Sequence, residues 1–597
     1  MSTDESRANP PMIAAADAEV LAAEKAELAA LAGKPLGIRF RGYARKSGPG
    51  WLQSAMTLGG GSAFSSLFLG AYFGFDLLWL QPLAMILGII MLSAMSHQTL
   101  STQQRPFVAM RKFGLPGIAW AWALATLLST LIWHFPQYGL AAGMTKDMIE
   151  AGTGWKVTGT GETCLLLAIG FAVLAFSTWI CWNYSKGHKG IRLYENLLKV
   201  MVWLIIAALA LVVIRGTMAG QVPWGRVLRG FLPLSIPTTA RGVSVLMAGF
   251  GAAVGINMTF LYPYSLLARG WGREHRGLAK FDLATGMLIP FTVATSLMVI
   301  AAGAVIFPFF EDYEAKDIAA ENAAIVVAAM AEADQAEPVG RVRALLWESL
   351  PQETREALAT NPAPAAIASA FNGAIRQEAL FGDEALLQVK ELPGDAKDIL
   401  RIPRERRDEK QLRLLNRLAI DAVFVEPAKM AGGKTVRYVK PCNMSMPPVK
   451  AAVMLERAGL GKLASRFVFG LGILAMALST ITTHMLVNGF AFCEVFGIEP
   501  KGWKYRLACL TPAPGILGVL FWSKMGPWIA VPTSAICGLL LPIAYVAFFL
   551  MNNRKDYLGE DKPVGLKALV WNIAMLVAIA TAFASALYYL YVQYLRG

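Results

Sequence analysis

The stretch Leu58-Gly59-Gly60-Gly61-Ser62 interrupts an apolar run over residues 51–73 that is long enough to cross a bilayer. Each glycine weakens a helix by about 1 kcal/mol relative to alanine. A membrane helix accommodates such a break only where the freed amide and carbonyl groups are buried in protein or line a wet cavity. Two explanations are open: close helix packing through small residues, or an unwound segment that binds a solute.

A second interruption, Gly255-Ile256-Asn257-Met258-Thr259, lies inside the apolar run 243–268. Paired interruptions in corresponding halves of a transporter point to its binding site. We therefore predict that membrane helices one and six are discontinuous, at about residues 59–62 and 255–259. The two breaks are expected to face each other near the middle of the membrane.

The composition is that of a polytopic membrane protein. The chain has 597 residues, 55% of them hydrophobic and 16% charged, with a mean hydropathy of +0.47. Basic cytoplasmic loops explain the net charge of +14, so no nucleic-acid partner is expected. The six cysteines show no metal-ligand spacing. Since no catalytic triad or phosphate loop lies outside the apolar runs, neither an enzyme nor a cofactor is predicted.

Eleven apolar runs are long enough to cross the membrane. They cover residues 51–73, 76–97, 116–144, 162–184, 191–214, 243–268, 281–309, 463–493, 505–523, 527–551 and 566–592. Basic residues up to Lys46 place the segment 1–46 in the cytoplasm. The sequence therefore predicts an all-α, multi-pass protein of the cell (inner) membrane whose C-terminus is external. Residues 47–310 hold helices one to seven, and residues 451–597 hold helices eight to eleven.

Residues 311–450 differ from the rest of the chain because they are rich in charged residues and alanine. Helical periodicity occurs at 319–333, 339–350 and 411–422, and residues 423–438 favour a short hairpin. We expect an external soluble insertion between helices seven and eight that is large enough to bury a small core. It also offers a surface for a protein partner.

The chain resembles the Nramp (natural resistance-associated macrophage protein) family of divalent-metal transporters from about Gly48 to Gly559, apart from the insertion. The stretch GPGWLQSAMTLGGGSAFSSLFLGAYFGFDLLW aligns without a gap with the family pattern GPG-F-L…DPGN…FGY-x-LLW. Further matches lie at 223–233, 478–482, 541–542 and 553–559. The resemblance implies a five-plus-five inverted repeat, with helices one and six unwound at the binding site.

The binding motifs depart from the family pattern. The family's DPGN falls on residues 59–62, so its metal-binding aspartate is missing and its asparagine is replaced by serine. Its MPH falls on residues 257–259, or a one-residue shift aligns Met258 with the family methionine; the proton-linked histidine is absent in both registers. The polar residue that the family offers from helix ten falls near Thr533 and Ser534.

The donors that remain are neutral. The predicted substrate site comprises Gly59, Gly60, Gly61, Ser62, Gly255, Asn257, Met258, Thr259, Thr533 and Ser534, of which Ser62, Asn257 and Met258 are the candidate metal ligands. Neutral oxygens compensate a divalent ion poorly for its lost water, which favours a cation that keeps its waters, such as Mg²⁺, over a transition metal. Half-helix N-termini beside Ser62 and Thr259 would also accept a carboxylate.

Two histidines lie within apolar runs. His134 is the candidate proton relay, because intramembrane ionisable groups are functional candidates and histidine titrates near neutral pH. The alternative is a histidine satisfied by a backbone carbonyl. For His484, a structural role is expected.

Three functions follow from the sequence. The first is secondary transport of a divalent cation in an Nramp-like core that lacks the usual aspartate. The second is transport of an organic solute, such as an amino or carboxylic acid, on the same scaffold. The third is a non-transporting sensor, against which two intact helix breaks would count.

Overall fold

The computed structural model describes residues 18–31, 33–184, 186–232, 240–306, 323–377, 380–389, 392, 394–407, 409–425, 428–429, 435–436, 448–498 and 502–591. Some side chains inside helices, including all of those from 522 to 536, lie outside this description. The regular secondary structure of the described chain is helical apart from one two-stranded ladder.

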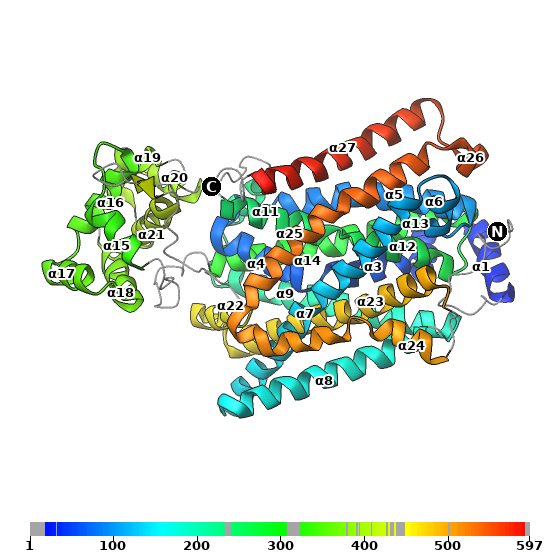
Figure 1. Cartoon of the computed structure of the whole chain (residues 1–597), viewed down its shortest axis with the longest axis horizontal. Helices are drawn as coiled ribbons and strands as arrows, with labels where there is room; N and C mark the ends of the chain where they lie inside the picture. The colour runs from blue at the N-terminus through cyan, green and yellow to red at the C-terminus, as the bar shows by residue number, and fades with distance from the viewer. Residues whose placement is uncertain are drawn as a thin grey trace.

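Long apolar helices pack side by side around one apolar core (Figure 1). Within the described ranges, seven helical segments are long and apolar enough to cross a membrane. They are Leu80–Thr102 (α5), Pro116–Thr153 (α7), Gly159–Tyr184 (α8), Lys189–Met218 (in α9, His188–Met218), Arg273–Ala304, Leu463–Phe496 and Gly565–Leu590 (α27). Helix α27 exposes Val570, Ile573 and Val577 at helical spacing, as a helix facing lipid does.

Two further helices are broken. Helix one consists of α3 (Pro49–Thr57) and α4 (Gly60–Phe73), and helix six consists of α11 (Ala240–Ala253) and α12 (Ile256–Ala268). Only residues 58–59 and 254–255 are non-helical, so the breaks are shorter than the sequence predicts. Residues 60–62 and 256–259 form the first turns of α4 and α12, where amide groups have no intrahelical partner and glycine is tolerated. The Ser62 hydroxyl closes the first break, because it accepts from Gly59 N (3.1 Å) and donates to Gly59 O (2.9 Å).

Further elements either connect the long helices or make up the two crossing segments Arg273–Ala304 and Leu463–Phe496. They are α6 (Pro106–Lys112), α10 (Trp224–Arg229), η2 (Arg273–His275), α13 (Arg276–Leu283), η3 (Ala284–Leu288), α14 (Ile289–Ala301), η4 (Ala302–Ile306), α22 (Pro448–Leu455), η9 (Glu456–Leu460), η10 (Leu463–Val468), α23 (Phe469–Phe496), α26 (Lys555–Leu558) and η12 (Gly559–Asp561). Elements η2 to η4 continue one another as the seventh crossing segment, and η10 with α23 forms the eighth.

The region after α23 differs from the two separate runs predicted at 505–523 and 527–551. It contains α24 (Gly502–Leu510), the 3-10 turn η11 (Ala513–Leu517) and α25 (Gly518–Asn552). The three residues between the predicted runs include one charged side chain, Lys524, and the helical backbone continues through them. The total of eleven crossings and the inverted repeat therefore stay predictions.

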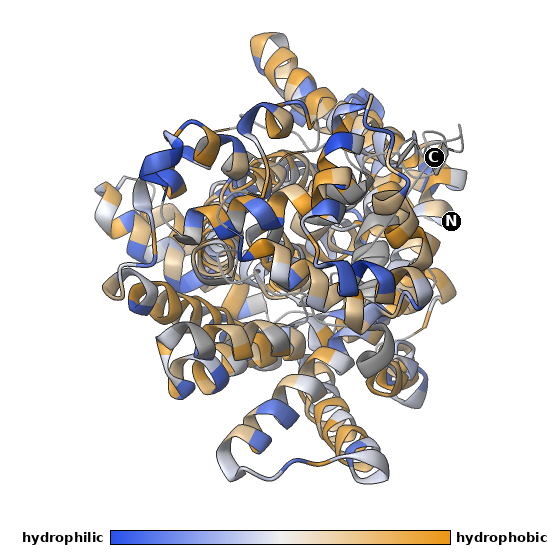
Figure 2. Cartoon of the chain, turned by 90° about the vertical axis from the view of Figure 1, so that its left-hand side faces the viewer, coloured by the Kyte–Doolittle hydropathy of each residue, from blue (hydrophilic) through white to orange (hydrophobic). Residues whose placement is uncertain are grey.

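The insertion has a core of its own. Its elements are α15 (Ala323–Ala331), α16 (Pro338–Glu348), α17 (Gln352–Thr360), α18 (Pro364–Ile375), α19 (Asp383–Leu387), α20 (Gly394–Leu400), η8 (Arg404–Arg406), α21 (Glu409–Val425), β1 (Ala428–Lys429) and β2 (Thr435–Val436). The strands are antiparallel, with Ala428 opposite Val436. Val342, Leu346 and Phe371 belong to a hydrophobic cluster separate from that of the bundle. Figure 2, viewed from this end, shows hydrophilic residues on the front helices and apolar residues on the helices behind.

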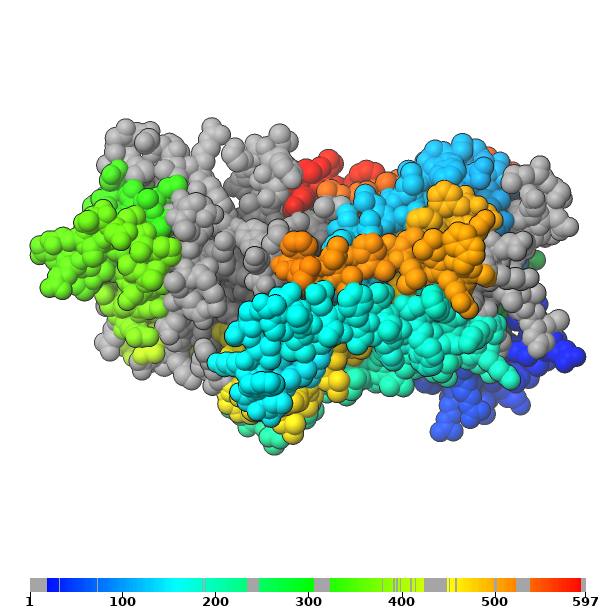
Figure 3. Space-filling model, turned by 60° about the horizontal axis from the view of Figure 1, so that its bottom comes forward, coloured from blue at the N-terminus to red at the C-terminus, as the bar shows by residue number. Residues whose placement is uncertain are grey.

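The two ends of the bundle carry different structures. The helices α1 (Ala18–Leu31) and α2 (Leu36–Lys46) lie at one end, which we call the N-terminal face. The insertion lies beyond the opposite end, toward which α27 also runs (Figure 1). The space-filling view shows the same separation, with the N-terminal helices in blue and the insertion in green (Figure 3).

Candidate functional site

The two helix breaks meet inside the bundle. The Thr57 hydroxyl, at the end of α3, donates to the Met258 Sδ in the first turn of α12, 3.2 Å away. Beside this contact lies a cavity of about 30 Å³, which we call the central cavity. Its lining comprises Met56, Thr57, Gly59, Gly61, Ser62, Trp133, Gln137, Gly251, Ala252, Gly255, Asn257, Met258, Thr480 and His484.

Close packing explains why three glycines are consecutive. A Cβ atom at Gly59 would lie 2.1 Å from the Thr480 hydroxyl, and one at Gly61 would lie 2.3 Å from the Trp133 ring. The amide of Gly60 donates to the Gln137 side-chain oxygen at 2.9 Å. Helices α7 and α23 therefore approach the first turn of α4 so closely that side chains there would clash. The run therefore packs tightly, as the first explanation requires, and it also contains the helix break; solute binding at the break stays a prediction.

The carbonyl groups freed at the end of α3 are met by hydroxyl groups of α23. Ser479 Oγ donates to Ala55 O at 2.9 Å, and Thr480 Oγ1 lies 3.4 Å from both Ala55 O and Met56 O. A broken membrane helix needs such partners because no water is available in the hydrocarbon region. The Ser-Thr pair thereby stabilises the interruption from the opposite helix.

The second break places a thioether at the junction. Met258 Sδ accepts from Gly255 N at 3.4 Å as well as from Thr57, and Met258 N donates to Asn257 Oδ1 at 2.9 Å. These contacts fix both side chains in the first turn of α12. A soft sulfur atom and an amide group thus lie together at the edge of the central cavity.

An imidazole pair extends the site toward α7. The Nε2 of His484 lies 3.5 Å from Asn257 Nδ2, and the Nδ1 atoms of His484 and His134 are 3.4 Å apart. If the Asn257 amide donates to His484, then His484 Nδ1–H donates to His134, and the proton of His134 sits on its Nε2. His134 is fully buried, does not line the cavity, and its Nε2 has no hydrogen-bond partner among the described residues.

The sequence analysis expected a structural role for His484, whereas the structure places its side chain at the central cavity. It lies four residues after Thr480 in α23 and therefore shares its helix face, and both side chains line the central cavity. Trp133 and Gln137, four residues apart in α7, line it in the same way. This spacing was the available signal, but the sequence alone does not tell which face of α7 or α23 meets the breaks.

The predicted site residues separate into three groups. Gly59, Gly61, Ser62, Gly255, Asn257 and Met258 line the central cavity. Gly60 bonds to Gln137, and the Thr259 hydroxyl donates to Ile256 O (2.5 Å) and accepts from the Trp122 indole (2.8 Å), so neither lines the cavity. The side chains of Thr533 and Ser534, in α25, lie outside the described residues.

The lining of the central cavity contains no carboxylate. In the described part of the chain, no group of three or more His, Cys, Asp or Glu side chains is arranged to hold a metal ion. Among the described residues, a cation in the cavity would therefore meet neutral sulfur, nitrogen and oxygen donors.

Two broken helices that meet at a small buried cavity inside an apolar bundle define a multi-pass membrane transporter. A sequence model of the family described as "Natural resistance-associated macrophage protein-like" (Nramp) matches residues 50–333 and 447–588. The chain belongs to the Nramp family, whose scaffold is that of a secondary transporter and not of an enzyme. Residues 334–446, most of the insertion, lie outside the match.

Solved structures share the fold. A manganese transporter of Eremococcus coleocola, in complex with an aromatic bis-isothiourea substituted compound, is 12% identical, with 98% of this chain and 92% of that chain covered and a TM-score of 0.50. A point mutant of a manganese transporter from that organism is 14% identical, with 92% and 89% covered and a TM-score of 0.50. No curated protein matches the chain by sequence.

Proposed function

We propose that the chain is a secondary transporter that moves a divalent cation through an alternating-access core without the family's usual aspartate. One observation carries the proposal: the Met258 thioether, the Asn257 amide and the His484 imidazole converge where the two broken helices meet, and an ion bound there would replace the contact between Asn257 and His484. The C-terminal ends of α3 and α11 add the negative ends of two helix dipoles, which favour a cation.

The donor set favours a first-row transition metal ion over Mg²⁺. Imidazole and thioether groups bind borderline and soft ions, whereas Mg²⁺ prefers oxygen ligands. This revises the expectation drawn from the sequence, which did not count His484 among the donors. Because an ion in a partly dry site is held most strongly by an opposite charge, binding by these neutral donors is expected to be weak and readily reversible.

The size of the central cavity also supports a cation. A volume of about 30 Å³ exceeds the roughly 10–15 Å³ that one water molecule requires, and it is far below the volume of an amino acid. An organic solute is the alternative, favoured by the absence of a carboxylate from the lining; it would require a more open state. The third function, a sensor, is disfavoured because both breaks are present.

Orientation and coupling complete the proposal. The N-terminal face is cytoplasmic and the insertion is external in the cell (inner) membrane, as the distribution of basic loops indicates. His134 is the relay candidate, reached from the central cavity through His484. With the family's proton-linked histidine missing, coupling to protons is expected to be weak.

Uptake by proteoliposomes tests the proposal. The purified protein would be supplied with Mn²⁺, Fe²⁺, Co²⁺, Zn²⁺, Mg²⁺ or amino acids, with and without a pH gradient. We expect saturable uptake of a transition metal ion above that of empty liposomes. Uptake of an amino acid without uptake of any metal ion would favour the organic-solute alternative.

A further inference from the structure

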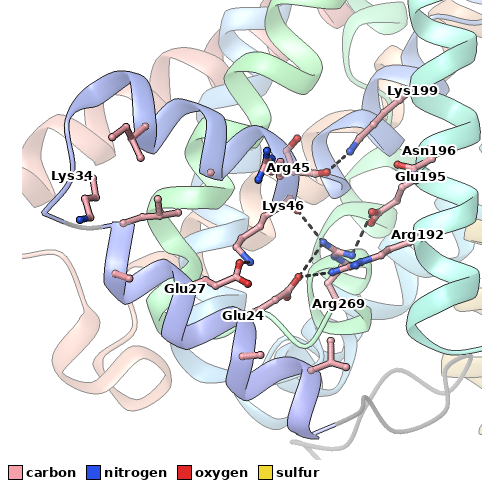
Figure 4. Close-up of a pocket in the computed structure, with 17 residues that line it drawn as sticks. Glu24, Glu27, Lys34, Arg45, Lys46, Arg192, Glu195, Asn196, Lys199 and Arg269 are labelled. Atoms are coloured by element: carbon pink, nitrogen blue, oxygen red, sulfur yellow. Dashed lines mark hydrogen bonds and ion pairs between the residues drawn. The ribbon is translucent and has the colours of Figure 1, made fainter.

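A second cavity, of about 760 Å³, lies at the N-terminal face between α1, α2 and the start of α9 (Figure 4). We call it the N-terminal cavity. Its charged lining residues are Glu24, Glu27, Lys34, Arg45, Lys46, Arg192, Glu195, Lys199 and Arg269. Six basic side chains thus oppose three acidic ones, and the volume is that of a typical ligand site.

The acidic side chains are all engaged. Glu24 lies 3.3 Å from Arg192 and 3.8 Å from Arg269, and Glu195 lies 3.6 Å from Arg269. Glu27 pairs with Lys46 at 2.5 Å, and this hydrogen bond lowers the pKa of Glu27.

Three of the six basic side chains make no ion pair with a described residue. Lys199 donates a hydrogen bond to Ser47 O, and Lys34 and Arg45 also have no ion-pair partner within the described ranges. The cavity therefore keeps an excess of positive charge.

Arg269 is a buried cation with unused donors. Its residue is 2% exposed, and its Nη2 donates to Lys46 O at 2.9 Å. Its Nε and Nη1 have no hydrogen-bond acceptor in the described part of the chain. A buried donor without an acceptor is costly, and an oxyanion in the cavity would supply one.

Helix α2 places the cavity at a membrane surface. It immediately precedes α3, the first half of a membrane helix, and its Leu36, Ile38 and Phe40 are 81%, 52% and 56% exposed. Exposed apolar residues beside Arg39 and Arg41 are typical of a helix that lies in the plane of the interface. Ile38 also lines the cavity, so apolar and basic groups occur together as an anionic lipid requires.

We propose that the N-terminal cavity binds the phosphate-bearing headgroup of an anionic phospholipid, whose negative charge is balanced by Lys34, Arg45 and Arg269 along the lining of the cavity. Basic pockets between membrane helices bind such headgroups. Lys46 lies just before α3, and Arg269 immediately follows α12. A bound headgroup therefore ties together the outer ends of the two half-helices that meet at the central cavity.

Lipid titration tests the proposal on the full-length protein in a neutral detergent. Short-chain phosphatidylglycerol, phosphatidylcholine and inorganic phosphate would each be titrated while the thermal midpoint is recorded. The test variant is Lys34→Gln with Arg45→Gln. The matched control is Arg39→Gln with Arg41→Gln, which removes the same charge from side chains that do not line the cavity.

We expect saturable stabilisation by phosphatidylglycerol of the parent and of the control, and about thirtyfold weaker binding by the test variant. Phosphatidylcholine should have no such effect. Equal weakening in both variants, or no preference for phosphatidylglycerol, would overturn the proposal. Stabilisation by inorganic phosphate as strong as that by phosphatidylglycerol would show that the site binds a soluble anion, and it would overturn the proposal of a lipid site. Because the readout is lipid binding, the outcome is independent of the solute that the core transports.

Discussion

The central cavity and the N-terminal cavity divide the chemistry of the protein between them. The central cavity is small and is lined by neutral donors, whereas the N-terminal cavity is large and is lined by nine charged side chains. Both adjoin the same half-helices, α3 and α12. The contrast shows that this chain places its charge where the helix ends are tied together and not where the solute is expected to bind.

Loss of the His484 imidazole is expected to have the largest effect, and it tests whether the neutral donors of the central cavity bind the solute. Replacing His484 with alanine removes the imidazole that lies beside Asn257, so metal uptake should fall about 100-fold. Removing even a group that only supports a metal ligand lowers metal affinity or activity about 10- to 100-fold. His97→Ala is the matched control, because His97 contacts Asp561 O and does not line the central cavity. Equal metal uptake by the His484 variant and the parent would show that the imidazole does not bind the metal ion.

Overpacking of the first break is expected to have the next largest effect. In Gly61→Ala the new methyl group would overlap the Trp133 ring, and such overpacking costs about 1–3 kcal/mol. The thermal midpoint in detergent should fall, and Trp133→Leu in the same chain should restore part of it. Gly117→Ala, where nothing lies within 4 Å of the added atom, should be neutral. A Gly61 variant as stable as the Gly117 variant would contradict the close approach.

Loosening of the N-terminal face should have a smaller effect. Glu24→Gln removes the charge that Arg192 and Arg269 share, and weakening a charged hydrogen bond costs about 1.5 kcal/mol or more. Amides of α1 should exchange hydrogen faster, while metal binding at the central cavity stays unchanged. Glu27→Gln is the control, because its side chain is mostly exposed and such pairs contribute little. Identical exchange in the two variants would count against a special role for Glu24.

The smallest effect is expected for the coupling of metal uptake to protons. Metal uptake by the parent should change little when a pH gradient is imposed, and His134→Ala should abolish whatever dependence there is. Uptake at several external pH values, compared for the two proteins, measures this. Strong proton coupling that survives the substitution would place the relay elsewhere in the chain.

Local patterns were enough to predict the breaks. Glycines inside apolar segments predict an interrupted helix, and the interruptions occur at the two predicted places. Their lengths were overestimated because glycine is also accepted in the first turn of a helix, where Gly60 and Gly61 lie. The close approach of Trp133 to Gly61 joins distant parts of the chain, so no pattern of neighbouring residues predicts it.

The donors of the site were harder to predict than its position. His484 and Ser479 belong to α23, which follows the insertion in sequence and packs against α3 only in the folded protein. Neither its register nor its inward face can be derived from apolar periodicity, because its polar residues, among them Thr480 and Thr482, are not confined to one face of the helix. Thr259, by contrast, was predicted in the site from its neighbours, yet its hydroxyl contacts Trp122.

Calorimetric titration of a restored carboxylate tests the central claim most directly. The ungapped match to the family pattern predicts that Gly59 takes the place of the family's aspartate, but a Cβ atom there would clash with the Thr480 hydroxyl. The variant is therefore Gly59→Asp with Thr480→Ala, and Thr480→Ala alone is its control. We predict weak Mn²⁺ binding to the parent and the control, and tighter Mn²⁺ than Mg²⁺ binding to the double variant, because the added charge is poorly screened in a partly dry site. Absence of metal binding in all three proteins, with amino-acid binding to the parent that the double variant loses, would contradict a cation site.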